Sequence, residues 1–242
     1  MIPQAATIIP QNVEKLPLYH WRPGARLLAV GSRDGADFSG DPTADRNTFR
    51  RPVTAGVLRE ALAKLHLDGI ALTWSASLRE AAGVAAVGAA EPSALVVVTP
   101  GVGDHELLDG LLPQVDAWVV LATVEPQPLT ARIIAEGRHV EVLIGLVDGR
   151  VPTLPWEQVA AAHLCAVRPA EADLLDAWAV EARAALPAEL AVYDQHHQHS
   201  ECRTCRERIV WRHSGRSRID ADLDADRRLV CRACGTVSPI RA

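Results

Sequence analysis

Short apolar runs alternate with amphipathic helical patterns along the first 195 residues, and this alternation limits the possible folds more than any other feature. The runs predict strands at residues 26–31, 69–74, 94–99, 117–122, 140–147, 161–167 and 190–193. Strands that are apolar on both faces and alternate with helices specify a parallel sheet covered by helices. About seven such units in ~190 residues favour an α/β fold that is a full or partial β/α (TIM-like) barrel over a doubly wound sheet.

Three helices are expected to begin at side chains that cap their first turn. Thr54 precedes one apolar helical pattern and Asp104 precedes another. Ser77, with Glu80 three residues later, forms a capping box before a third.

Four of the five cysteines form two Cys-x2-Cys pairs near the end of the chain, Cys202 with Cys205 and Cys231 with Cys234. Two such pairs complete the tetrahedral, all-thiolate shell of a structural Zn²⁺ site, which leaves no coordination position open for catalysis. Two disulfides or an iron–sulfur cluster are the alternatives, and a cytoplasmic chain disfavours the disulfides.

The residues between the two pairs predict a hairpin, and therefore a zinc ribbon. Residues 208–212 form one strand, Ser214 and Gly215 the turn, and a return strand precedes Cys231. Gly235, directly after the second pair, supplies the backbone freedom that a metal-binding turn commonly uses. Arg206 holds the equivalent position after the first pair, which predicts a less regular turn there.

A change in charge indicates a boundary near residue 200. Residues 200–242 contain 10 Arg and six Asp or Glu, a net charge of +4, whereas the first 199 residues carry a net charge of −9. We therefore predict a barrel domain over residues 1–195 and a four-cysteine zinc ribbon over residues 196–242. The overall net charge of −5 argues against a general nucleic-acid-binding chain.

Binding of nucleic acid through the ribbon is also the weaker interpretation, because aspartates follow its arginines in the same hairpin. The arginines are Arg203, Arg206, Arg208, Arg212, Arg216 and Arg218. The aspartates that offset them are Asp220, Asp222, Asp224 and Asp226.

The compartment expected from the sequence is the cytoplasm. No stretch approaches the ~18 uninterrupted apolar residues of a membrane span, and residues 1–4 lack the basic start of a signal peptide. The basic residues are 23 Arg and two Lys, which is typical of a high-GC bacterial gene.

Other histidines and the fifth cysteine give weaker signals. We interpret His196, His197 and His199, just before the first cysteine pair, as part of a polar linker rather than a metal site. Cys165 lies inside an apolar run and is expected to be a buried, inert thiol.

Both ends of the chain resemble one known family. Near the N-terminus the sequence reads Glu14-Lys15-Leu16-Pro17-Leu18-Tyr19-His20-Trp21-x-Pro23-Gly24, followed by a strand that ends in Gly31. This segment resembles the start of the AmmeMemoRadiSam-type radical SAM proteins, relatives of the pyruvate formate-lyase activating enzymes, which also end with two Cys-x2-Cys pairs around a hairpin. The resemblance implies a β/α barrel of the radical SAM type.

The chain departs from this family at the residues that carry its chemistry. In the family, the loop after the first strand carries Cys-x3-Cys-x2-Cys, which holds a [4Fe–4S] cluster that binds S-adenosylmethionine. Ala36, Gly40 and Thr43 stand at those positions, and no cysteine lies before His163. Thiolates ligate such clusters, so we expect neither a [4Fe–4S] cluster nor S-adenosylmethionine. Residues 73–77 also lack the acidic turn of the family.

Two interpretations of function follow. The first is a pseudoenzyme, a non-catalytic relative that serves as a binding or scaffolding partner of an unidentified protein, with no membrane and no nucleic-acid partner. The second is an enzyme with non-radical chemistry at the barrel mouth, where active sites of β/α barrels collect. Its candidate ligands for Mg²⁺ are Asp34, Asp37, Asp41 and Asp45. Its candidate acids or bases, which nothing in the sequence brings together, are His20, His105 and His139.

Overall fold

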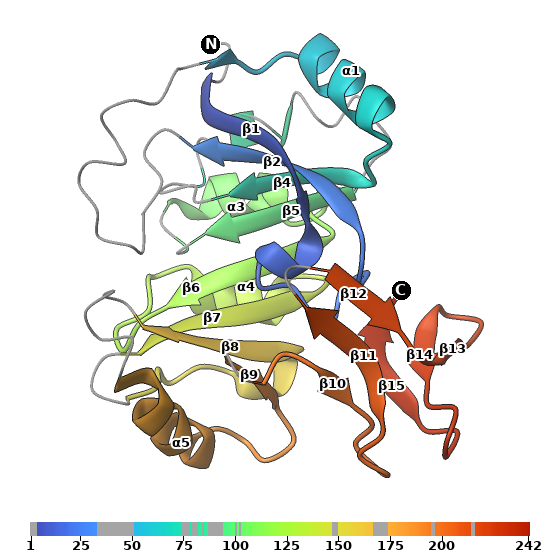
Figure 1. Cartoon of the computed structure of the whole chain (residues 1–242). Helices are drawn as coiled ribbons and strands as arrows, with labels where there is room; N and C mark the ends of the chain where they lie inside the picture. The colour runs from blue at the N-terminus through green and yellow to red at the C-terminus, as the bar shows by residue number, and fades with distance from the viewer. Residues whose placement is uncertain are drawn as a thin grey trace.

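The computed structural model describes residues 4–32, 51–73, 78, 82–83, 85–86, 94–99, 101, 103–146, 150–166, 174–194, 197–213 and 216–242. One large, mostly parallel sheet and its helices make up the first part of this mixed α/β structure. The last residues form a small all-β ribbon beside the sheet (Figure 1).

Nine strands form the large sheet, in the order β3-β1-β2-β4-β5-β6-β7-β8-β9. Their bounds are β1 Gln4–Asn12, β2 Arg26–Ser32, β3 Arg51–Pro52, β4 Gly69–Thr73, β5 Ala94–Thr99, β6 Ala117–Ala122, β7 Val140–Leu146, β8 Ala161–Ala166 and β9 Ala191–Tyr193. All seven predicted strands are present, and each pairs in parallel with the next along the chain. The antiparallel strands β1 and β3 were not predicted, because β1 contains Pro10 and polar residues at both ends.

The helices are α1 Ala55–Leu65, α3 His105–Leu111, α4 Thr130–Glu136 and α5 Leu175–Ala185, with short 3-10 turns at Val13–Lys15 and Trp156–Gln158. Capping side chains begin two of these four helices, α1 and α3, whereas α4 and α5 follow leucines that form no side-chain cap. Thr54 Oγ1 accepts a hydrogen bond from Val57 N at 3.3 Å, and Asp104 Oδ1 accepts one from Leu107 N at 2.8 Å, so both predicted N-caps are confirmed. The predicted capping box at Ser77 and Glu80 lies outside the described residues.

The order of the parallel strands determines which side of the sheet the helices cover. Each strand is added on the same side of the previous one, and right-handed crossovers then place every connecting helix on one face. On that face, strand residues such as Val120 and Ile144 form one core with Leu58 of α1, Leu108 of α3 and Ile133 of α4. The opposite face is left for other segments to cover.

The segment between β1 and β2 covers part of the opposite face. Val13, Leu16, Leu18 and Trp21 form a second buried core with alternate strand residues. Those strand residues include Ala71, Val96, Val98, Ala117, Val119, Leu121 and Leu143. Among the described residues, no hydrogen-bonded ladder joins the edge strands β3 and β9, so the sheet is not closed there.

The ribbon contains two small antiparallel sheets where the sequence predicts one hairpin. β10 Ser200–Glu201, β11 Arg208–His213 and β12 Arg216–Ile219 form the first sheet. β13 Asp222–Leu223, β14 Arg228–Val230 and β15 Val237–Arg241 form the second. β11 and β12 pair as predicted, but the strand before Cys231 pairs with β13 and β15 instead. Each cysteine pair thus lies between two strands of its own sheet.

Backbone hydrogen bonds attach the ribbon to the segment before β2. Arg22 N donates to Arg241 O at 2.7 Å, and Arg241 N donates to His20 O at 3.0 Å. Gly24, with a φ of +86°, allows close approach, because a Cβ there would lie 3.2 Å from Ser217 Oγ. The boundary between residues 195 and 196 stays a prediction. No helix in the described part of the chain is long and apolar enough to cross a membrane.

Candidate functional site

The four cysteines predicted to bind metal come together in the ribbon. Their sulfur atoms all lie within 4.8 Å of one another, with 3.5 Å between Cys202 and Cys234 and 3.6 Å between Cys205 and Cys231. A tetrahedral ion with ~2.3 Å metal–sulfur bonds needs sulfur atoms ~3.8 Å apart, whereas a disulfide needs ~2.05 Å. The arrangement therefore fits four thiolates around one ion rather than two disulfides.

Both cysteine pairs sit in turns with the same backbone hydrogen bonds. In the first turn, Cys202 N donates to Glu207 O at 2.8 Å and Arg206 N donates to Cys202 O at 3.0 Å. In the second, Cys231 N donates to Thr236 O at 2.9 Å and Gly235 N donates to Cys231 O at 2.8 Å. Arg206 has a φ of 64° and Gly235 a φ of 74°, so the arginine takes the left-handed conformation of the glycine. The expected irregularity of the first turn is therefore wrong.

Hydrogen bonds favour the thiolate form of two of the four cysteines. The N–H of Cys205 is the main cause that lowers the pKa of Cys202 to about 6, and the N–H of Thr204 contributes. The pKa of Cys234 is lowered by its hydrogen bond with the Thr236 hydroxyl, whose oxygen is 3.2 Å from Cys234 Sγ. The N–H of Glu207 acts to lower the pKa of Cys205, but burial and the hydrogen bonds with the other three cysteines raise it to about 12. The thiolate is the form that binds metal, so the surroundings favour that form at Cys202 and Cys234.

The other cysteine and the nearby histidines do not join this cluster. Cys165, half-buried on β8, donates to Ile144 O at 3.4 Å, and burial raises its pKa to about 12, as expected for an inert thiol. His197 lies 3.0 Å from Asp194 Oδ1, and His199 Nδ1 accepts from Arg212 N at 3.0 Å. His196 lies outside the described residues.

A buried polar network on the face of the sheet away from the helices was not predicted. At its centre is Glu141 of β7, which is fully buried and accepts four hydrogen bonds. The N–H groups of Tyr19 and His20 donate from 2.8 Å, and the imidazoles of His139 and His163 lie 3.0 and 2.7 Å away. Burial acts to raise the pKa of Glu141, but the hydrogen bonds with His139 and His163 outweigh it and hold the pKa well below its usual range.

The network continues from His20 into the ribbon. His20 Nε2 lies 2.7 Å from Tyr193 Oη, which lies 2.7 Å from Ser200 Oγ. Arg212 of β11, only 3% exposed, donates to Ser200 Oγ at 2.8 Å and also to Tyr19 O. Its guanidinium lies 4.3 Å from the centre of the Tyr19 ring, a cation–π contact. Burial lowers the pKa of His20 to about 3 and raises that of Tyr193 to about 12, so both are neutral near pH 7.

The structure brings together two of the three histidines considered as acids or bases. His20 and His139 both contact Glu141, whereas His105 lies at the surface with Nδ1 3.1 Å from Arg132 Nη1. The acidic loop with Asp34, Asp37, Asp41 and Asp45 lies outside the described residues, as do Ala36, Gly40 and Thr43.

The aspartates of the ribbon do not offset all of its arginines. Asp220 and Asp222 pair with Arg232 at 2.8 and 3.0 Å, and Arg218 is 3.6 Å from Asp220. Asp224 and Asp226 pair with Arg228 at 2.8 and 3.4 Å. In the described part of the chain, Arg203, Arg206 and Arg208 have no carboxylate partner. The expected neutralisation is therefore incomplete.

No known protein family, no curated protein and no solved structure matches the chain.

Substitutions at Arg206 and Gly235, the residues with left-handed backbone in the two turns, should have opposite effects on stability. Arg206→Gly should stabilise the metal-loaded protein by about 0.5–1 kcal/mol, because glycine adopts a positive φ without strain. Gly235→Ala should destabilise it by about 1 kcal/mol, because its Cβ would meet no atom within 4 Å and only the backbone strain remains. Denaturant unfolding at saturating metal measures both. A loss of stability in Arg206→Gly would contradict the equivalence of the turns.

Replacing the carboxylate of Glu141 should destabilise the protein strongly. The amide of Glu141→Gln offers one acceptor oxygen and turns an NH₂ group toward donors, so we expect a loss of about 3 kcal/mol. The control is Glu125→Gln, at an exposed residue after β6, which should change the free energy of unfolding by less than about 0.5 kcal/mol. Equal effects of the two substitutions in denaturant unfolding would contradict the role given to Glu141.

The burial of His20 predicts a loss of stability in mild acid. Its pKa is about 3 in the folded protein and ~6.5 when unfolded, so below pH 6.5 the unfolded chain binds the extra proton. The unfolding free energy should therefore lose about 2 kcal/mol through this group as the pH falls from 7 to 5. His20→Gln should show a slope between pH 7 and pH 5 that is smaller by this amount. The same slope in both proteins would show that His20 is not buried and neutral.

Proposed function

We propose that the protein is a non-catalytic β/α protein of the radical SAM type, which acts as a binding or scaffolding partner and carries a structural zinc ion. The main observation behind the proposal is the four-cysteine cluster, whose four sulfur atoms can form one closed coordination shell around a metal ion. A closed shell leaves no position for a substrate or for water, so the ion has a structural role. The remaining cysteine, Cys165, lies apart from it on β8.

Two features of the sheet support a fold of the radical SAM type. Its seven parallel strands follow one another without a reversal of order, as in β/α barrels and unlike doubly wound sheets. The face away from the helices is also buried, as the interior of a barrel is. An open sheet with this strand order corresponds to a partial barrel.

The absence of cluster ligands in the sequence supports the non-catalytic assignment. No cysteine precedes Cys165, so the loop after β2 supplies no thiolate for an iron–sulfur cluster. On the inner face of the sheet, the titratable groups Glu141, His139 and His163 bond to one another, and with Tyr19 and His20 they hold the segment before β2 in place. These groups have a structural task, and the proposal assigns them no chemistry.

Zinc is the metal we assign, because four thiolates in a tetrahedral shell are its usual structural site. Purified protein should contain about one zinc per chain and no iron, and Cys231→Ser with Cys234→Ser should lose the metal and unfold the ribbon. Cys165→Ser is the matched control and should keep the zinc. Metal analysis of the three proteins measures this, and a zinc content that falls with Cys165 would contradict the assignment.

The same sample tests the non-catalytic assignment. After anaerobic treatment with iron and sulfide, the protein should neither cleave S-adenosylmethionine nor show the visible absorption of a [4Fe–4S] cluster. A cluster that cleaves S-adenosylmethionine would overturn the proposal. Tight Mg²⁺ binding that is lost in Asp37→Ala with Asp41→Ala would favour an enzyme at the barrel mouth instead.

A further inference from the structure

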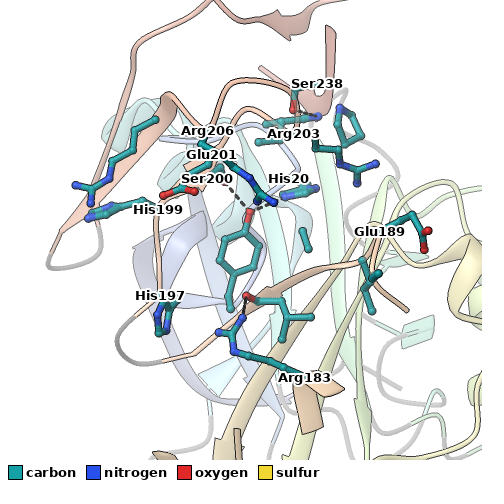
Figure 2. Close-up of a pocket in the computed structure, with 18 of the residues that line it drawn as sticks. His20, Arg183, Glu189, His197, His199, Ser200, Glu201, Arg203, Arg206 and Ser238 are labelled. Atoms are coloured by element: carbon teal, nitrogen blue, oxygen red, sulfur yellow. Dashed lines mark hydrogen bonds between the residues drawn. The ribbon is translucent and has the colours of Figure 1, made fainter. Parts of the chain in front are cut away.

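A cavity of about 610 Å³ lies between the ribbon and the start of β9 (Figure 2). Its walls come from three parts of the chain: the loop and strand at residues 187–193, the first metal-binding turn with its flanking strands, and residues 238–240 of β15. His20 of the segment before β2, Arg183 of α5, and His197 and His199 before β10 also contribute. The volume is within the range of small-molecule sites, about 300–1,000 Å³.

Three arginines without carboxylate partners in the described part of the chain line this cavity. Arg203 and Arg206 belong to the first metal-binding turn, and Arg208 begins β11, with its guanidinium 4.6 Å from the Trp211 ring centre. Figure 2 labels Arg203, Arg206 and His20 among the residues that line the cavity. A fourth arginine in the wall, Arg183, is already paired with Asp194 at 2.7 Å.

The wall also contains two carboxylates, Glu189 and Glu201, so the net charge of the three arginines and two glutamates is positive. The aspartates of the ribbon cannot change it, because they pair with other arginines on β12, β14 and the second turn. Guanidinium groups form paired hydrogen bonds with carboxylate and phosphate oxygens, so the excess charge favours an anionic ligand.

His20 links the wall of the cavity to the buried network. Its Nε2 lies 2.7 Å from Tyr193 Oη, which lies 2.7 Å from Ser200 Oγ, and Arg212 donates to Ser200 Oγ. Tyr193 and Ser200 line the cavity together with His20. The network therefore holds this part of the wall in place.

The rest of the wall suits the apolar part of such a ligand. Pro187, Leu190 and Val192 contribute from the loop before β9 and from β9, and Pro239 and Ile240 from β15. The loop before β9 and His20 of the segment before β2 line the cavity. Both segments lie at the edge of the sheet where the parallel strands begin (Figure 1). This is the edge opposite the predicted barrel mouth, so the inference does not depend on the proposed function.

We propose that this cavity binds a small organic anion, with its phosphate or carboxylate group held by Arg203 and Arg206, and its apolar part against the apolar residues of the wall.

Calorimetric titration of the metal-loaded full chain with phenyl phosphate and with benzoate tests this. Saturable binding of either is expected, and the tighter one identifies the anionic group. Arg203→Ala combined with Arg206→Gly should weaken that binding at least about tenfold, the effect of losing charged hydrogen bonds. Glu201→Gln should strengthen it, because one opposing charge is removed.

The matched control is Arg216→Ala, an exposed arginine on β12 that does not line the cavity, which should leave the affinity unchanged within about twofold. No saturable binding of either anion up to about 10 mM would overturn the proposal. So would binding that Arg216→Ala weakens as much as the double variant, or preferential binding of a single-stranded oligonucleotide, since both indicate a general basic surface. Cleavage of S-adenosylmethionine would overturn only the proposed function.

Discussion

The buried carboxylate of Glu141 is the interaction on which the arrangement of the whole molecule depends. The strand order places the helices on one face of the sheet, so another segment must cover the opposite face. Glu141 holds that segment through the N–H groups of Tyr19 and His20. A fully buried carboxylate is stable only with its hydrogen bonds satisfied. The segment must therefore follow a backbone path that brings the N–H groups of Tyr19 and His20 to Glu141. The segment fixed in this way then receives the ribbon, through hydrogen bonds with Arg241.

Separate interactions therefore stabilise the fold of the ribbon and fix its position. Its own fold rests on a small core around Ile209, Val210 and Leu229, with two of the four cysteines buried in it, and a core of this size needs a metal to be stable. Its position rests on the backbone hydrogen bonds of Arg241 with Arg22 and His20, and on Arg212 of β11, which donates to Tyr19 O and Ser200 Oγ. Loss of the metal should unfold the ribbon, whereas loss of Arg212 should leave it folded but less firmly attached.

The sequence predicts the regular part of the fold well, because periodicity and capping are local properties. The seven parallel strands and the caps at Thr54 and Asp104 follow from neighbouring residues, and the cysteine pairs from their spacing. The network around Glu141 joins residues more than 100 positions apart, so no local pattern reveals it. One signal was present: Glu141 and His163 are polar residues inside otherwise apolar strands, and a buried polar residue requires a partner. The ion pairs of the ribbon's arginines could not be predicted either, because the positions of the aspartates along the chain do not show which arginine each one contacts.

The proposed metal site and the proposed anion site share the first cysteine turn. A metal ion bound by Cys202 and Cys205 would fix the backbone of Arg203 between them and of Arg206 directly after them. Arg206 takes a left-handed conformation, at a position where glycine occurs in the equivalent turn. A strained backbone that persists in a fold is a reason to look for a use of the side chain. The proposed anion site gives Arg206 such a use, because glycine at this position would remove a guanidinium from the wall of the cavity.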